Sequence, residues 1–238
     1  MIRVKRAAEP KVLQKNAQRW LKELLEALNE LEQAPKEQLK QAKKKFEKIQ
    51  QKYNHKEVKD ALVKMFYGKC AYCESRITVV TYGQIEHFYP KSAYPDKTFA
   101  WDNLLLSCDK CNNTQHKGIL FPLDSAGQPL LIDPTDAQAD PFIHFRFSWD
   151  EQISWASVYG LDERGKKVVE IFDLNGSRGR MDLIKGRSAF INRLLCILKI
   201  YEQTKASEAF SLLQAACSPE EEYSAFALAL VKPYIAQE

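Results

Sequence analysis

Four cysteines form two C-x-x-C pairs in the middle of the chain. The first pair is Cys70 and Cys73, and the second pair is Cys108 and Cys111. Two such pairs in one chain supply the four thiolates of a tetrahedral zinc site. Zinc held by four sulfurs has no open coordination position, so it would stabilise the fold and activate no water. The predicted zinc site therefore says nothing about catalysis by itself.

Polar residues between and after the cysteine pairs are of types that could carry out hydrolysis. Glu86 and His87 are adjacent, Asn103 follows, and Asn112 and His116 come shortly after the second pair. An imidazole near its own pKa can accept a proton from water at neutral pH. A carboxylate can hold a hard divalent cation, such as Mg²⁺, that polarises a phosphate. The set points to metal-assisted hydrolysis of a phosphodiester.

Composition places these residues in a globular protein. The chain has 238 residues and is 45% hydrophobic, which is enough for a core. It has no apolar run of 18 residues and no apolar stretch after its first basic residues, so we expect a cytoplasmic protein without a membrane span. In a reducing compartment six cysteines favour metal binding over disulfides. Cys196 lies in an apolar run and is predicted to be a core residue.

Charge is unevenly distributed along the chain. Residues 1–66 carry 17 basic and 9 acidic side chains, residues 67–124 carry 6 of each, and residues 125–238 carry 12 and 16. A basic front end suits a phosphate-bearing partner. It also fits a helix surface that faces only solvent, and both interpretations apply to the run Lys43-Lys44-Lys45.

Apolar periodicity predicts a helical hairpin before the first cysteine pair. After an extended arm over 2–10, residues 11–33 have apolar side chains at helical spacing. Residues 36–53 repeat them at alternating steps of three and four, and Ala34-Pro35 separates the two segments. Asn54 is the predicted N-cap of a third helix that leads into Cys70.

The residues around the candidate site should form short strands and turns. Residues 76–81 are β-branched and predict a strand, and Gly83 should turn the chain into a second strand over 84–88. A loop over 89–100 and a short buried run at Leu104-Leu105-Leu106 follow. The second cysteine pair should start a helix or helical turn, on which Asn112 and His116 would face the same way.

The remaining residues are expected to be mostly helical. Alternation over 142–149 and 153–159 predicts a β-hairpin. Residues 168–174 fit either a strand or a short helix, and the second half of 177–201 is helical in pattern. Ser218-Pro219-Glu220-Glu221 is typical of a helix start, so the last helix should begin there.

The order of a Glu-His pair, an Asn-Leu-Leu strand and a C-x-x-C-Asn run resembles the signature of HNH nucleases. This resemblance implies a ββα-metal finger in which His87 would be the general base and Glu86 would bind the metal. Asn103 would fix the loop that orients His87, through hydrogen bonds to the backbone. Asn112, at a position that is often histidine in the family, would also bind the metal.

The resemblance leaves the roles of two further residues undecided. His116 is a second candidate ligand of the catalytic Mg²⁺, and Lys117 would hold the scissile phosphate or form a solvated end. Four residues separate Asn112 from Lys117, whereas many C-x-x-C-Asn motifs have only two. The zinc would hold strand and helix together around the site.

The likeness extends beyond the motif to the PtuB-type HNH proteins. It rests on the stretches Ile2-Arg3-Val4-Lys5-Arg6, 66–74, Cys111-Asn112-Asn113, Lys117-Gly118 and Phe121-Pro122-Leu123. Proteins of this type belong to Septu anti-phage systems and to some retron systems. The resemblance implies an effector nuclease that works beside a PtuA-type ATPase. In a retron setting, a reverse transcriptase and its reverse-transcribed DNA would join it.

These observations together predict an α+β protein of three regions. A basic helical region over 1–66 would precede a zinc-stapled ββα-metal (HNH) core over 67–124, and a mostly helical region with a β-hairpin would follow over 125–238. The substrate would be nucleic acid, either DNA or RNA. The alternative is a zinc-ordered module that binds nucleic acid or protein without cutting, which would need none of Glu86, His87 or Asn112.

Overall fold

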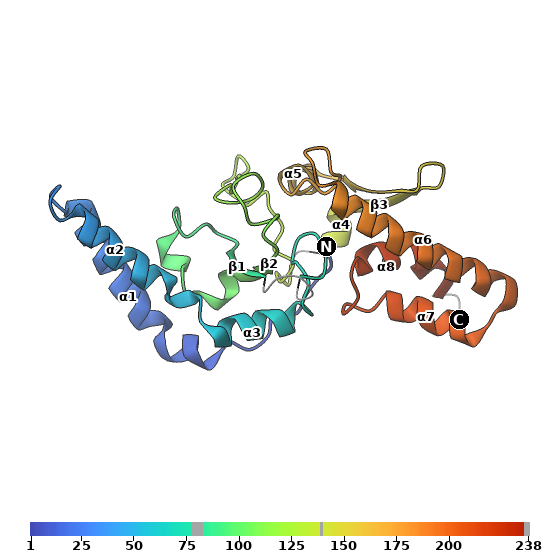
Figure 1. Ribbon diagram of the computed structural model, residues 1–238, viewed down its shortest axis with the longest axis horizontal. Coiled ribbons are helices and arrows are strands. Elements are labelled where there is room, and N and C mark those ends of the chain that lie inside the picture. The colour runs from blue at the N-terminus through green and yellow to red at the C-terminus, as the bar shows by residue number, and fades with distance from the viewer. Residues whose placement is uncertain (78–82, 139, 236–238) are drawn as a thin grey trace.

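The computed structural model describes residues 1–77, 83–138 and 140–235. The molecule is elongated, with a helical hairpin at one end, a two-stranded sheet near the middle and three helices at the other end (Figure 1). This mixture of helices and strands fits the predicted α+β class. Within the described ranges, no helix combines the length and the apolar character needed to cross a bilayer.

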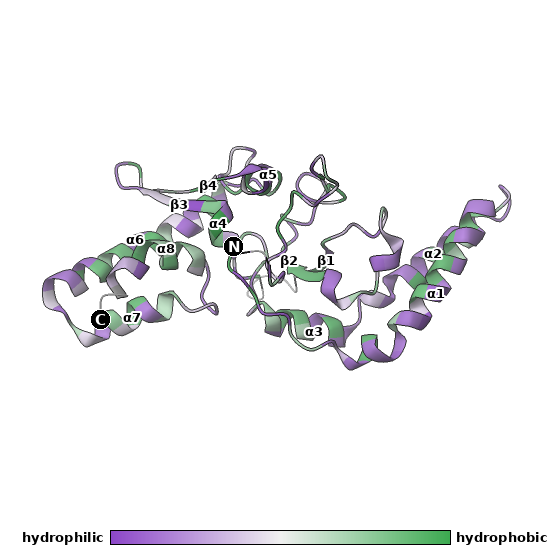
Figure 2. Ribbon diagram, turned by 180° about the vertical axis from the view of Figure 1, so that it is seen from behind, coloured by the Kyte–Doolittle hydropathy of each residue, from purple (hydrophilic) through white to green (hydrophobic). Residues whose placement is uncertain are grey.

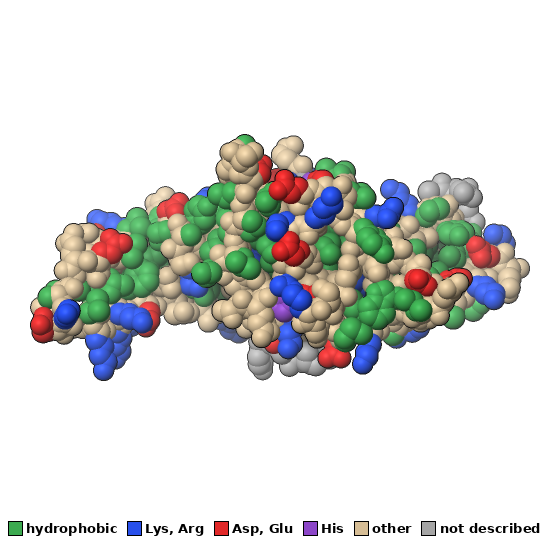
Figure 3. Space-filling model, turned by 90° about the horizontal axis from the view of Figure 1, so that it is seen from above, with side chains coloured by type: hydrophobic (Ala, Val, Ile, Leu, Met, Phe, Trp, Pro, Cys, Tyr) green, Lys and Arg blue, Asp and Glu red, His purple; other side chains and the backbone are tan. Residues whose placement is uncertain are grey.

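The N-terminal hairpin forms as its periodicity predicts. Helix α1 (Lys11–Gln33) is followed by α2 (Leu39–Gln50) and the short 3₁₀ helix η1 (Gln51–Tyr53). Polar and apolar residues alternate along α1 and α2 (Figure 2). Of these two helices, only α1 has buried side chains. Lys45 forms an ion pair with Glu30 across the hairpin. Basic and acidic side chains are also intermixed on the face shown in Figure 3.

The third helix, α3 (Lys56–Met65), begins one residue later than predicted. An N-cap at Asn54 would make residue 55 the first helical residue. Asn54 closes the preceding 3₁₀ turn, because its N–H donates to the Gln51 carbonyl at 2.9 Å. His55 then has the extended backbone of an N-cap, and its Nδ1 accepts from the Glu57 N–H at 3.2 Å. The predicted Asn54 cap is therefore wrong, and His55 takes its place.

The central sheet consists of β1 (Gln84–His87) and β2 (Leu104–Ser107), paired antiparallel with Glu86 opposite Leu105. The connecting loop contains the short 3₁₀ helices η2 (Pro95–Lys97) and η3 (Trp101–Asn103). Most of the strand predicted over 76–81 lies outside the described residues. From Cys108 to Gly118 the chain makes turns and no α-helix, because the Asn113 side chain accepts from the Gln115 and His116 N–H groups and closes a turn.

The C-terminal region contains the predicted β-hairpin. The short helix α4 (Pro141–His144) leads into β3 (Phe145–Asp150), which pairs antiparallel with β4 (Trp155–Gly160). The undecided segment 168–174 is helical only as far as Ile171, where α5 (Glu163–Ile171) ends, and continues as a turn. The long helix α6 (Met181–Thr204) and the shorter α7 (Ser207–Ala216) follow.

Two expectations for this region are wrong. The last helix, α8 (Ser224–Ile235), begins six residues after Ser218, because residues 218–223 form turns and Tyr223 has a positive φ of 53°. Cys196 is exposed on α6 and does not belong to the core. The buried face of α6 passes through Leu194 and Leu198, and a residue two positions after Leu194 points away from it.

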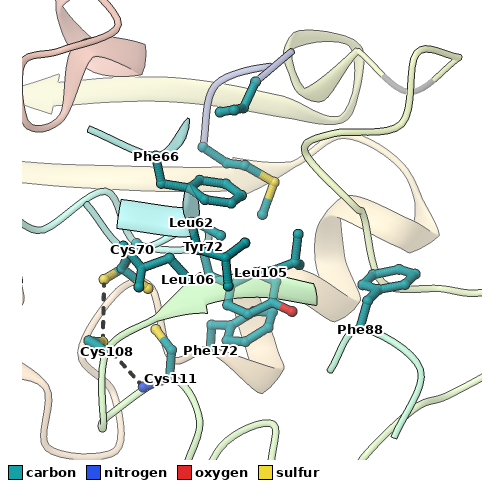
Figure 4. Close-up of a cluster of buried hydrophobic side chains, with 14 of the residues drawn as sticks. Leu62, Phe66, Cys70, Tyr72, Phe88, Leu105, Leu106, Cys108, Cys111 and Phe172 are labelled. Carbon is teal, nitrogen blue, oxygen red and sulfur yellow. Dashed lines mark hydrogen bonds between the residues drawn. The ribbon is translucent and has the colours of Figure 1, made fainter. Parts of the chain in front are cut away.

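One hydrophobic cluster takes residues from all three parts of the chain. Figure 4 shows Leu62 from α3, Leu105 from β2, and Phe66 and Phe172, which directly follow α3 and α5. Tyr72, between the first two cysteines, stacks on Phe172 with ring centroids 4.0 Å apart. A smaller cluster lies among α6, α7 and α8. The cysteine pairs are thus packed between the N-terminal and C-terminal regions.

Candidate functional site

The four predicted zinc ligands converge in the structure. The Sγ atoms of Cys70, Cys73, Cys108 and Cys111 all lie within 4.8 Å of one another, and all four side chains are buried. Figure 4 labels Cys70, Cys108 and Cys111 of this set. Tetrahedral zinc with Zn–S bonds of 2.3 Å places its sulfurs roughly 3.8 Å apart. The Sγ atoms of Cys73 and Cys108 are 3.9 Å apart. The donor set and its spacing fit a closed zinc site.

A buried arginine that sequence reasoning missed adjoins this cluster. Arg180 directs Nη1 to Cys111 Sγ at 3.4 Å and to the Phe172 carbonyl at 2.5 Å. Four thiolates around one Zn²⁺ would carry net negative charge, and the guanidinium would offset part of it. Arg180 immediately precedes α6, so this contact ties the C-terminal helices to the cysteine cluster.

Three of the candidate catalytic residues line one cleft of about 200 Å³. Glu86 and His87 come from the end of β1, and Asn112 follows the last cysteine. Tyr53, from the end of the N-terminal hairpin, and Lys91, from the loop after β1, complete its polar and aromatic walls. The cleft therefore combines a carboxylate, an imidazole, an amide, a phenol ring and an ammonium group.

His87 is held as a neutral imidazole of one tautomer. Its side chain is only 5% exposed, and Nε2 lies 2.9 Å from the Thr98 carbonyl oxygen. Because a carbonyl can only accept, Nε2 carries the proton and Nδ1 keeps the lone pair. Burial lowers the pKa of His87 to about 4, with the Thr98 hydrogen bond opposing the shift. At neutral pH the imidazole is therefore uncharged, and Nδ1 keeps a free lone pair.

Asn103 is buried behind this loop and fixes its shape. Its Oδ1 accepts from the Tyr89 N–H at 2.7 Å, and its Nδ2 donates to the carbonyls of Tyr89 at 3.0 Å and Lys97 at 3.1 Å. The side chain thus joins the two ends of the loop after β1. Thr98, which holds the His87 ring, directly follows Lys97. Asn103 therefore sets the position of the carbonyl that orients His87.

Glu86 is buried in an ion pair with Lys117. Lys117 is fully buried, contacts the Glu86 carboxylate and donates to the His87 carbonyl at 2.7 Å. Burial raises the pKa of Glu86, and the Lys117 charge opposes this shift. The structure thus fits neither predicted role of Lys117, a phosphate contact or a solvated end, because its ammonium group is enclosed beside Glu86.

Asn112 and His116 lie in different surroundings. Asn112 Nδ2 donates to Gln84 Oε1 at 2.9 Å, which leaves its Oδ1 as a possible metal ligand. His116 pairs through Nδ1 with Asn113 Oδ1 at 3.0 Å and does not line the cleft. Burial, followed by the charge of Arg180, lowers the pKa of His116. The structure therefore brings Glu86, His87 and Asn112 together and places His116 outside their cleft.

The donor set of the cleft fits a hard divalent cation. The Glu86 carboxylate and the Asn112 amide oxygen are of the oxygen type that Mg²⁺ prefers. Two wall residues, Tyr53 and Lys91, were not predicted. Tyr53 looked like one more apolar position of the helical seam, and Lys91 belongs to no motif.

Comparison with protein families identifies the central region. Residues 70–118 match the family model described as HNH endonuclease. This range contains the cysteine cluster and the residues Glu86, His87, Asn103 and Asn112. Residues 70–118 are thus similar to HNH endonuclease domains.

The wider chain is similar to Septu proteins PtuB. It is 34% identical to the Septu protein PtuB of Bacillus mycoides (strain KBAB4) over 201 aligned positions, covering 74% of this chain and 63% of that relative. It is also 34% identical to the PtuB of Bacillus thuringiensis over 119 positions, covering 50% of this chain and 41% of the relative. The chain thus spans less than two thirds of the length of either relative. These matches confirm the predicted resemblance to PtuB-type HNH proteins.

Proposed function

We propose that this protein is a metal-dependent endonuclease that hydrolyses phosphodiester bonds in nucleic acid. The observation that carries the proposal is the neutral His87, with an unprotonated Nδ1, in one cleft with Glu86 and Asn112. A zinc-ordered binding module has no need for an imidazole buried in this state. The HNH family match supports the same reaction class.

In this mechanism, His87 Nδ1 accepts a proton from the attacking water. The Thr98 carbonyl then stabilises the imidazolium through the Nε2–H, and Asn103 keeps that carbonyl in place. A divalent cation held by Glu86 and Asn112 would supply Lewis-acid stabilisation of charge on the phosphate. Lys117 holds the Glu86 carboxylate at the wall of the cleft. The zinc cluster only supports the fold, since its four thiolates leave no position for water.

The metal role of Asn112 predicts a shifted Mg²⁺ dependence. Asn112→Ala removes one oxygen donor from a partly exposed position, so zinc content and melting temperature should stay near wild type. Cleavage should need a Mg²⁺ concentration on the order of 10-fold higher for half-maximal rate. Cleavage assays over a Mg²⁺ series would measure this shift, with Thr114→Ala, at an exposed position of the same turn, as the control. An unchanged midpoint would remove Asn112 from the metal site.

We further propose that the protein acts as the effector nuclease of an anti-phage defence system with a PtuA-type ATPase. The support is its similarity to PtuB proteins of Septu systems. A retron system is the second setting in which such a nuclease would work, together with a reverse transcriptase and its reverse-transcribed DNA.

Partner binding can be tested by co-purification. When the tagged chain is expressed with the ATPase encoded beside it, the two proteins should elute as one complex, and phage defence should need both. Recovery of a reverse transcriptase with bound DNA would instead place the protein in a retron system. Separate elution, with full defence by the chain alone, would contradict the ATPase proposal.

A further inference from the structure

The proposed reaction builds negative charge on the phosphate, which a side-chain cation can stabilise in addition to the divalent metal, and the buried Lys117 does not supply that side chain. Its charge is already matched by Glu86 in a contact that excludes solvent. Lys91 is the second ammonium group near the reacting residues, and it lines the cleft together with Glu86, His87 and Asn112. Since Glu86 and Lys117 balance each other, Lys91 gives the cleft a net positive charge.

The surroundings of Lys91 leave it free to bind an anion. Within the described ranges, no ion pair joins Lys91 to a carboxylate within 4.0 Å; Glu86 and Lys117 act on it only at longer range. Its Nζ lies 5.6 Å from the centroid of the Tyr53 ring, a cation–π distance. The Tyr53 ring also meets the His87 ring edge-on, with centroids 4.5 Å apart. One aromatic ring thus positions both the ammonium group and the imidazole.

We propose that Lys91, held over Tyr53, forms the subsite for the scissile phosphate and stabilises the negative charge that develops on it. The inference rests on the proposed nuclease function. It also gives the N-terminal hairpin a task, because Tyr53 and Gln50 at its end form part of the cleft wall.

Lys91 transfers no proton in the chemical step. A water oxygen bonds to phosphorus while the bond from phosphorus to the leaving oxygen breaks. One water proton goes to His87 Nδ1, and the leaving oxygen takes a proton from solvent. The non-bridging oxygens gain charge in the transition state, and the Lys91 ammonium donates hydrogen bonds to them.

The same loop offers a matched control. Lys97 lies over the ring of Tyr89, with Nζ 4.7 Å from its centroid, so it has the same kind of contact as Lys91. It lines a different, larger cavity of about 710 Å³, beside Arg6 and Asp133. Changing the Lys97 side chain leaves its backbone carbonyl, to which Asn103 donates, in place. Such a change therefore removes an equivalent charge and cation–π contact from the loop without touching the catalytic cleft.

The test compares Lys91→Met, Lys91→Arg and Lys97→Met in single-turnover cleavage of labelled nucleic acid. Lys91→Met should lower the rate at saturating substrate by about 10²-fold. Lys91→Arg should restore much of that rate, and Lys97→Met should cleave like wild type. The Mg²⁺ midpoint of Lys91→Met should stay the same or fall, because a nearby positive charge is lost, whereas loss of a metal ligand raises it.

Three results would overturn the subsite. The first is a Lys91→Met protein that cleaves saturating substrate at the wild-type rate. The second is a Lys97→Met protein that loses as much of this rate as Lys91→Met does. The third is a Lys91→Met protein that needs more Mg²⁺ than wild type for its half-maximal rate. If Lys91→Met melts well below wild type, Lys91→Gln replaces it and must show the same rate loss at a normal melting temperature. A wild-type protein that cleaves nothing would instead overturn the proposed function, and the inference with it.

Discussion

Cys111→Ser should strip zinc from the protein and unfold the region around both cysteine pairs. Cys111 is fully buried, and the four sulfurs it helps to assemble lie inside the main hydrophobic cluster. Structural zinc supplies about 10–16 kcal/mol in small zinc domains, whereas a whole domain is stable by about 5–15 kcal/mol. Losing one thiolate therefore removes a contribution comparable with the entire stability. Elemental analysis and thermal melting measure the two effects.

Cys196 offers the matched control for this change. It is an exposed cysteine on α6, far from the cluster in sequence, so Cys196→Ser should keep zinc content and melting temperature at wild-type values. A strong chelator should reproduce the Cys111→Ser result in the wild-type protein. A Cys111→Ser protein with native melting and no zinc would show that the cysteines are only core residues.

His87→Ala should abolish cleavage and leave zinc in place. The change removes the Nδ1 base, and general-base catalysis contributes typically about 10²–10⁴-fold, or roughly 3–5 kcal/mol of barrier. His87 contacts none of the cysteines through the bonds described above, so zinc content should not change. The lost ring contact with Tyr53 should lower the melting temperature far less than Cys111→Ser does. Single-turnover cleavage and elemental analysis measure the outcome.

His116 is the control histidine. It is also buried, lies in the same HNH domain and stands outside the cleft. His116→Ala should therefore retain most of the cleavage rate and the wild-type Mg²⁺ midpoint. A loss equal to that of His87→Ala would place His116 in the metal site after all.

Local patterns explain which parts of the fold could be predicted. The limits of α1 follow from its apolar spacing and from Pro10 and Pro35, which act over a few residues. The zinc ligands follow from C-x-x-C spacing, because each pair must turn back on one metal. Glu86 and His87 were expected at a strand end, and β1 does end at His87.

Contacts between distant segments explain what could not be predicted. Tyr53 reaches the cleft only because the end of the N-terminal hairpin lies beside His87 at the end of β1, and no local pattern separates it from a core tyrosine. Arg180 meets Cys111 across 69 residues. The placement of His116 outside the cleft depends on the turn that Asn113 closes, which replaces the helix on which His116 and Asn112 were expected to align.

The most direct test of the nuclease assignment is cleavage by purified, zinc-loaded protein. Wild-type and His87→Ala proteins, each alone and with the neighbouring ATPase, would be incubated with end-labelled DNA and RNA in Mg²⁺ or in EDTA. The structure predicts Mg²⁺-dependent cleavage of at least one substrate by the wild type and none by His87→Ala, with equal binding of that substrate by both. Cleavage by His87→Ala at the wild-type rate, or binding without cleavage by the wild type in every condition, would contradict the assignment.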